Sequence, residues 1–278
     1  MRLRSLLFVP GDRPDRMEKA LAAGADGLIL DLEDSVAEAR KGEARDAVVA
    51  FLNRPERPVP LLVRVNPLRS AHIDADLVAT TAARADAIML PKAEGAKSIL
   101  ALSTWTGLPI LPIATETPAA IFALGTYVEV ADRLLGLTWG AEDLPAAIGA
   151  TAAREVDGRY TAPIEMARSL ALMGAHAAGV PAIETVYPDF RDLDGLAAYA
   201  ARGARDGFTG MMAIHPDQVA VINRAFTPNA AEIAAARAIV DAFAADPQAG
   251  VLVVEGKMVD APHLAQARRL IERAGEQA

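Results

Sequence analysis

Short apolar segments rich in β-branched residues alternate with longer amphipathic segments along most of this chain. The amphipathic segments, such as 38–52 and 165–178, carry apolar residues at helical spacing with Ala, Arg and Glu between them. The apolar runs are nearly continuous, as is typical of parallel strands covered on both faces. We expect strands at 4–9, 27–32, 61–65, 87–91, 110–114, 134–139, 182–186 and 208–214.

Eight strands alternating with helices predict an α/β fold, a (β/α)8 TIM barrel, for residues 1–225. Residues 226–278 are expected to form a helical C-terminal extension. Asn229 and Glu232 have the spacing of a capping box that opens one helix, and Asp260 with Pro262 matches the N-cap region of the last.

Composition narrows the class of protein. Apolar residues make up 52% of the 278, yet no run approaches the roughly 20 apolar residues of a membrane span. A net charge of −8 argues against a nucleic-acid or anionic-membrane surface, so an anionic substrate would need a local basic pocket. The absence of cysteine excludes disulfides and thiol chemistry and favours a cytoplasmic enzyme. The apolar start of the chain is too short for a signal peptide and is interpreted as the first strand.

Two carboxylates follow consecutive strands of the expected barrel. Glu116 ends the run before Thr117-Pro118, and Asp143 comes one strand-plus-helix repeat later. Side chains at the exits of neighbouring parallel strands lie side by side at the barrel mouth, where this pair could hold a hard divalent cation. Two structural alternatives stay open: Glu116 as a residue before a helix start, and Asp143 as a helix N-cap.

Basic residues accompany these carboxylates at other strand exits. Arg64 either faces the mouth, where its guanidinium would capture a substrate carboxylate, or pairs with buried Asp31 or Glu33. Lys92 follows the fourth strand and offers a different chemistry, because some barrel aldolases form a Schiff base on a strand lysine.

The first strand is followed by a basic turn that opens a helix. Its backbone N–H groups, with Arg13, Arg16 and Lys19, could bind phosphates; ordinary solvated side chains are the alternative. His215 follows the eighth strand, and we assign it a structural role.

Several motifs together resemble the citrate lyase β-subunit family, which groups with HpcH/HpaI-type aldolases and malyl-CoA lyases. The resemblance covers nearly the whole chain. It rests on SLLFVPGDRP (5–14), LDLEDSV (30–36), VRVNP (63–67), LPK (90–92), ET (116–117), GAEDL (140–144), AIHPDQ (213–218) and GKMVD (256–260).

This resemblance implies a Mg²⁺-dependent carbon–carbon lyase that cleaves a citryl thioester, citryl-CoA or citryl-ACP, into oxaloacetate and an acetyl thioester. It implies that Glu116 and Asp143 are the metal ligands and that Glu116 and Arg64 line the substrate site. To that substrate site we add Asp34 and Phe8. The basic turn, Arg13, Arg16 and Lys19, would face coenzyme A or the phosphopantetheine of an acyl carrier.

Catalysis is assigned to Arg64, Glu33 and Asp260. In related lyases the aspartate of the GKMVD motif, here Asp260, enters the active site of a neighbouring subunit, commonly in trimers. The resemblance thus implies a homotrimer, with the C-terminal extension packing on a neighbour and with citrate lyase α and acyl-carrier subunits as candidate partners. Alternatives are a malyl-CoA or methylmalyl-CoA lyase, a malate synthase-like thioester enzyme, a Lys92 Schiff-base aldolase and a non-catalytic complex subunit.

Overall fold

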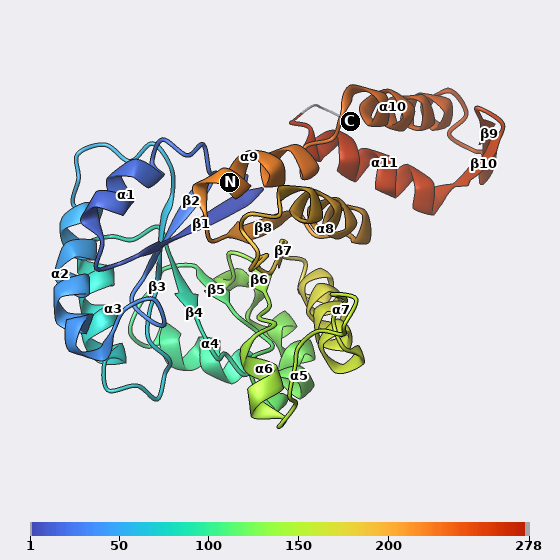
Figure 1. Cartoon of the computed structure of the whole chain (residues 1–278). Helices are drawn as coiled ribbons and strands as arrows, with labels where there is room; N and C mark the ends of the chain where they lie inside the picture. Colours follow the sequence, from blue (N-terminus) through green and yellow to red (C-terminus); the bar gives the residue numbers. More distant parts are fainter. Residues whose placement is uncertain (1, 276–278) are drawn as a thin grey trace. The chain divides into compact units, whose positions relative to one another are not determined.

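The structure, a computed structural model, describes residues 2–275, and its first unit is a barrel of eight parallel strands (Figure 1). Paired strands follow the order β5-β4-β3-β2-β1-β8-β7-β6. Parallel bridges Ile110↔Leu134 and Ile113↔Thr138 join the two ends of this order, so the sheet closes on itself. The strands are β1 (Ser5–Pro10), β2 (Gly27–Asp31), β3 (Leu61–Arg64), β4 (Ala87–Leu90), β5 (Ile110–Pro112), β6 (Leu137–Thr138), β7 (Ala182–Glu184) and β8 (Gly210–Ala213).

The predicted (β/α)8 barrel is confirmed, with every expected strand in place. The largest difference is at 134–139, where the regular ladder covers only Leu137–Thr138. Leu134 makes a single bridge to β5, and Trp139 is fully buried although it lies beyond the strand. Burial therefore extends past the hydrogen-bonded ladder, and an apolar run overestimates the length of a strand at such a place.

Helices cover the outside of the barrel (Figure 1). No helix in the described part of the chain is long and apolar enough to span a bilayer. The helices that begin in this unit are α1 (Pro14–Ala20), η1 (Glu38–Arg40), α2 (Lys41–Leu52), α3 (Ile73–Ala82), α4 (Ala96–Ser103), α5 (Pro118–Ala123), η2 (Leu124–Arg133), α6 (Asp143–Ala147), α7 (Ala162–Ala177), α8 (Leu193–Asp206) and α9 (Pro216–Ala225).

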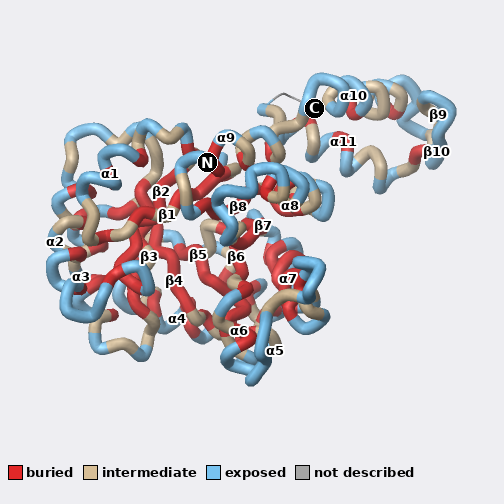
Figure 2. The backbone as a smooth tube through the Cα atoms, viewed as in Figure 1, coloured by how far each residue is buried: buried red, intermediate tan, exposed pale blue. Residues whose placement is uncertain are grey.

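The barrel interior is filled by apolar side chains, and Figure 2 shows the strands as its buried part. Leu6, Ile29, Leu62, Met89 and Leu111, one from each of the first five strands, belong to a single packed cluster. Burial of such side chains contributes about 2 kcal/mol each to folding. The interior is thus a packed core, and polar chemistry is left to the ends of the strands.

The chain divides into two compact units, Met1–Asn223 and Arg224–Ala278. The second unit contains α10 (Ala230–Ala245), β9 (Val251–Val254), β10 (Lys257–Asp260) and α11 (Ala261–Arg273). The predicted capping box opens α10: the Asn229 N–H donates to Glu232 Oε2 at 2.8 Å, and the Glu232 N–H donates to Asn229 Oδ1 at 3.0 Å. Asp260 occupies the N-cap position of α11, as predicted.

The two expected helices, α10 and α11, are present, and between them β9 and β10 form an antiparallel hairpin that the sequence pattern did not predict. Glu255 and Gly256 connect them with φ angles of 49° and 75°. Two successive positive φ angles are typical of a type I′ turn, the tight hairpin connection that favours glycine. The signal was present in the sequence as an apolar VLVV run followed two residues later by KMVD.

Candidate active site

The two carboxylates predicted to pair converge on one residue of the neighbouring strand exit, Lys92. The Lys92 N–H donates to Glu116 Oε2 at 2.5 Å, and Lys92 Nζ lies 3.4 Å from Asp143 Oδ1. Lys92 has a φ of 53°, a left-handed conformation that costs a non-glycine residue about 1 kcal/mol. In this conformation the Lys92 amide N–H bonds Glu116 while the Lys92 ammonium contacts Asp143. The three side chains therefore form one cluster at the mouth.

Glu116 and Asp143 differ in their exposure to solvent. The Glu116 residue is 4% exposed, whereas the Asp143 side chain is 38% exposed. Burial raises the pKa of Glu116 to about 8, and the nearby Asp143 and Glu33 charges act in the same direction. Asp143 is the first residue of α6, with Glu142 at the N-cap position, so the N-cap alternative for Asp143 is wrong by one residue.

This carboxylate pair fits a divalent cation of the magnesium type. Mg²⁺ binds oxygen ligands and usually takes one or two carboxylates, leaving its other positions to water and substrate. Among residues 2–275, no group of three or more His, Asp or Glu side chains is placed to hold a metal ion. A metal ion bound beside Glu116, in addition to the Lys92 ammonium, would also stabilise the ionised form of this buried carboxylate.

Arg64 pairs with buried carboxylates at the barrel mouth. Its Nε donates to Asp31 Oδ1 and its Nη2 to Asp31 Oδ2, both at 2.6 Å. Its Nη1 lies 3.1 Å from Glu33 Oε2 and 3.7 Å from Asp34 Oδ2. Burial opposes the charge of the guanidinium, but these carboxylates raise the pKa of Arg64 overall. Of the two hypotheses for Arg64, the structure supports pairing with a buried carboxylate. One edge of the guanidinium bonds Asp31, and Nη1 is turned towards Glu33 and Asp34.

Glu33 links the arginine to the lysine. Its Oε1 accepts a hydrogen bond from Lys92 Nζ at 2.7 Å while its Oε2 contacts Arg64. Burial raises the pKa of Glu33, against the opposing effect of these two cations. Charges thus alternate from Asp31 through Arg64, Glu33 and Lys92 to the carboxylate pair. The sequence indicates Lys92 only as a candidate amine nucleophile; its bridging position between carboxylates is not predicted, although its place directly after an apolar run was an available signal.

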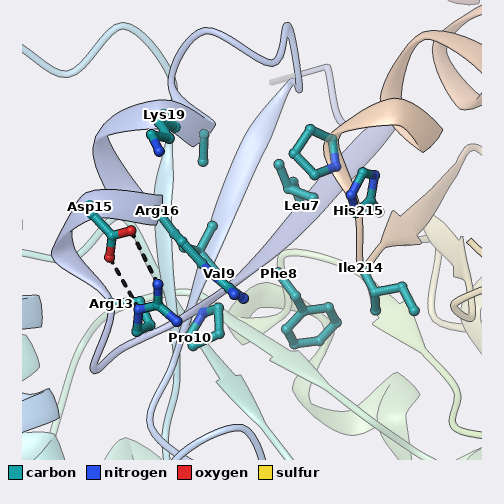
Figure 3. A pocket seen from close by; sticks show the side chains of 12 residues that line it. Leu7, Phe8, Val9, Pro10, Arg13, Asp15, Arg16, Lys19, Ile214 and His215 are labelled. Carbon is teal, nitrogen blue, oxygen red and sulfur yellow. Dashed lines mark hydrogen bonds and ion pairs between the residues drawn. The ribbon is translucent and has the colours of Figure 1, made fainter.

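A basic cavity of about 480 Å³ lies beside this cluster, between the exits of β1 and β8. Figure 3 shows Arg13 and Arg16 on one side of Phe8 and Ile214 and His215 on the other. The predicted phosphate-binding residues Arg13, Arg16 and Lys19 are therefore brought together, although Arg13 also pairs with Asp15 at 3.1 Å.

His215, for which the sequence predicts a structural role, also lines this cavity. Its ring stacks on Phe190, with 4.9 Å between the ring centroids. Phe8 connects the cavity to the carboxylate cluster, because the Arg64 guanidinium carbon lies 4.9 Å from the centre of the Phe8 ring. A ligand with a phosphate-bearing end and a short acidic end could occupy both regions at once.

Asp260 belongs to the second unit. Its Oδ1 lies 2.5 Å from His263 Nδ1, and this hydrogen bond lowers the pKa of Asp260. The assignment of Asp260 to the active site of a neighbouring subunit remains a prediction.

Comparisons with known proteins match almost the whole chain. The HpcH/HpaI aldolase/citrate lyase family model matches residues 4–216. A citrate lyase subunit beta-like protein of Mycobacterium tuberculosis is 38% identical over 97% of this chain and 95% of its own length. A (3S)-malyl-CoA thioesterase of Cereibacter sphaeroides is 35% identical over 98% of this chain and 94% of its own length.

The solved structures agree. The crystal structure of protein CitE from M. tuberculosis, in complex with magnesium, acetoacetate and coenzyme A, superposes with a TM-score of 0.86 at 37% identity, covering 99% of both chains. These matches confirm the resemblance drawn from the motifs and the prediction of an enzyme of the lyase type. The chain belongs to the HpcH/HpaI aldolase/citrate lyase family.

Proposed function

We propose that this protein is a Mg²⁺-dependent carbon–carbon lyase that cleaves a citryl thioester, citryl-CoA or citryl-ACP, into oxaloacetate and an acetyl thioester. The observation that carries the proposal is the convergence of Glu116 and Asp143 on Lys92 at the barrel mouth. The similar protein CitE, solved with magnesium, acetoacetate and coenzyme A, supports it.

Glu116 and Asp143 would hold the Mg²⁺ ion. When bound, the ion supplies Lewis-acid stabilisation for the oxygen that changes from hydroxyl to ketone. Arg64 stabilises negative charge on the keto-acid side, and its double hydrogen bond to Asp31 fixes the guanidinium for that task. Phe8 and Asp34, which contact Arg64, border the substrate.

The reaction requires one proton to leave and one to arrive. As the carbon–carbon bond breaks, the citryl hydroxyl would pass its proton to the Asp260 carboxylate of a neighbouring subunit and become the ketone of oxaloacetate, while the electron pair of the broken bond passes to the thioester as an enolate. The same Asp260, protonated in that step, would then return the proton to the enolate carbon as general acid, giving the acetyl thioester. Glu33 holds Arg64 and Lys92 in place during these steps through its two carboxylate oxygens.

The basic cavity would bind the thioester carrier. Arg13, Arg16 and Lys19 are suited to the phosphates of coenzyme A or phosphopantetheine, and the apolar lining is suited to the carrier arm. Phe8 lines this cavity and contacts Arg64, so a carrier bound in the cavity could extend its thioester to Arg64 and the carboxylate pair.

The test is a substrate panel. Citryl-CoA, malyl-CoA and methylmalyl-CoA are assayed with Mg²⁺ and with EDTA, using the wild type, Glu116→Gln and Asp143→Asn. We expect oxaloacetate from citryl-CoA, loss of turnover with EDTA, and at least a hundredfold loss in either variant. Asp194→Asn, an exposed carboxylate in the first turn of α8, is the matched control and should remain active. A metal-independent activity would contradict the proposal.

A malyl thioester is the second candidate substrate, because the Cereibacter sphaeroides relative is a (3S)-malyl-CoA thioesterase. Release of glyoxylate from malyl-CoA would identify a malyl-CoA lyase, and release of free malate would identify a thioesterase. A non-catalytic subunit of a lyase complex predicts no turnover of any thioester.

The quaternary structure is proposed with the function. A homotrimer in which Asp260 completes a neighbour's site predicts a particle near three times the chain mass of 29.2 kDa. Mixing inactive Asp260→Asn with inactive Glu116→Gln subunits should then restore part of the activity, because some mixed sites contain neither substitution.

A further inference from the structure

Thr115, the residue before Glu116, connects two loops at the barrel mouth. It is fully buried, and its hydroxyl makes two hydrogen bonds to one residue of the next loop. Thr115 Oγ1 donates to the Gly140 carbonyl at 3.0 Å and accepts from the Gly140 N–H at 3.1 Å. A single side chain thus takes the place of a pair of backbone hydrogen bonds.

This contact continues the barrel where its regular pairing stops. Strands β5 and β6 are joined by isolated bridges, the last of which is Ile113↔Thr138. Next to it, the Ala114 N–H donates to the Thr138 carbonyl at 2.9 Å. Beyond that point Thr115 holds Gly140, and the chain then runs through Ala141 and Glu142 to Asp143.

Gly140 also packs directly against Glu116. A Cβ atom at position 140 would lie 3.0 Å from Glu116 Cγ and 3.3 Å from Ile113 Cγ2, closer than ordinary van der Waals contact. The segment that leads to Asp143 is therefore pressed against the side chain of the other carboxylate, with Thr115 holding it there.

We propose that Thr115 is a positioning residue for the metal site: its hydroxyl fixes the separation of the Glu116 and Asp143 carboxylates before a cation binds. This inference rests on the proposed metal-binding role of that pair. Mg²⁺ demands near-ideal octahedral geometry at short distances, whereas the larger Ca²⁺ tolerates irregular ligand positions. Loosening the contact should therefore weaken Mg²⁺ binding more than Ca²⁺ binding.

The experiment measures both affinities by calorimetric titration of the full chain. Thr115→Val keeps the shape but removes both hydrogen bonds, and we expect Mg²⁺ affinity to fall about tenfold while Ca²⁺ affinity changes less than about threefold. Thr115→Ser retains a hydroxyl and should restore Mg²⁺ affinity. Thr138→Val is the matched control, because it removes an equally buried hydroxyl that bonds the Ile183 carbonyl instead; its affinities should match the wild type.

A second variant tests the same contact from the other side. Gly140→Ala would press on Glu116 and should also lower Mg²⁺ affinity selectively, so it decides the matter if Thr115→Val does not fold. The inference is overturned if the decisive variant keeps the wild-type ratio of Mg²⁺ to Ca²⁺ affinity, or if Thr115→Ser binds as weakly as Thr115→Val. Glu116→Gln distinguishes a failure of the Thr115 positioning role from a failure of the proposed metal site. If Glu116→Gln also leaves Mg²⁺ binding unchanged, the proposed metal site itself is wrong.

Discussion

Arg64 and Asp31 form a double ion pair in which both carboxylate oxygens accept from the same edge of the guanidinium, each at 2.6 Å. Asp31 is buried and accepts a further hydrogen bond from the Glu33 N–H at 2.9 Å. The planar fork of Arg64 is therefore held by a rigid anchor, and only Nη1 points towards Glu33 and Asp34. This arrangement presents one defined donor to the barrel mouth.

Arg64→Lys should keep the positive charge and lose this geometry, because an ammonium cannot bond both Asp31 oxygens in a plane. We expect kcat/KM for the cleaved thioester to fall about a hundredfold, a loss typical of removing one oriented donor. Arg45→Lys is the control, because Arg45 contacts the buried Asp76 at 3.0 Å through a similar ion pair on α2 and α3. Full activity in Arg64→Lys would show that charge alone suffices.

Much of the fold was predictable, because each barrel strand is a short apolar run between amphipathic helices, and both properties are local. Hydropathy did not predict the hairpin at 251–260, because the four apolar residues of β9 alternate between exposed and partly buried positions and do not enter a core. The better signal for the hairpin was its turn, because only two residues, Glu255 and Gly256, separate the two strands and both have positive φ angles.

The candidate site was predictable only as a set of strand exits. Strand counting placed Glu116 and Asp143 on one rim, but the partners of each side chain depend on tertiary packing. The sequence could not show that Lys92 adopts a left-handed conformation and contacts three carboxylates, or that His215 faces the basic cavity. Such contacts arise between segments far apart in the chain, where no spacing rule applies.

Mg²⁺ binding should depend on pH through Glu116. Burial raises the pKa of this carboxyl from its ordinary 4.5 to about 8. Between these values the folded metal-free chain holds a proton that the unfolded chain has lost, so its stability falls as pH rises through this window. Mg²⁺ must displace the same proton, so its affinity should rise up to about tenfold per pH unit below pH 8 and level off above.

Calorimetry in two buffers of different ionisation enthalpy measures this effect directly. Release of close to one proton per Mg²⁺ is expected near pH 6.5, and almost none near pH 9. Glu116→Gln should bind weakly at every pH with no proton release. Equal wild-type affinity at pH 6.5 and pH 9 would rule out Glu116 as the coupled group.

Lys92 should not form a Schiff base with a keto acid. Burial alone would lower the pKa of Lys92, but the hydrogen bond to Glu33 and the charges of Glu116 and Asp143 raise it above its ordinary value overall. An ammonium in that state has no lone pair for attack on a carbonyl. Borohydride added with oxaloacetate should therefore leave the chain mass unchanged, and a trapped adduct on Lys92 would revive the Schiff-base aldolase.

A buried ion network under the β6 and β7 exits should matter for stability. Glu184 is fully buried and accepts hydrogen bonds from Trp139 Nε1 at 2.5 Å and Tyr199 OH at 2.9 Å. Arg168 reaches the same carboxylate at 2.8 Å and also bonds Asp206 at 2.8 Å. Because a buried carboxylate without its cation is costly, Arg168→Met should lower the free energy of unfolding by about 3–5 kcal/mol.

Denaturant unfolding of Arg168→Met, Glu184→Gln and the double variant would measure this coupling. Neutralising Glu184 removes the charge that Arg168 compensates, so the double variant should lose less stability than the sum of the two single losses. Arg159→Met breaks an exposed pair with Asp157 and should leave the unfolding midpoint unchanged. Additive losses would mean that Arg168 stabilises the barrel through packing on Phe208, which its guanidinium carbon approaches to 4.8 Å, rather than through charge.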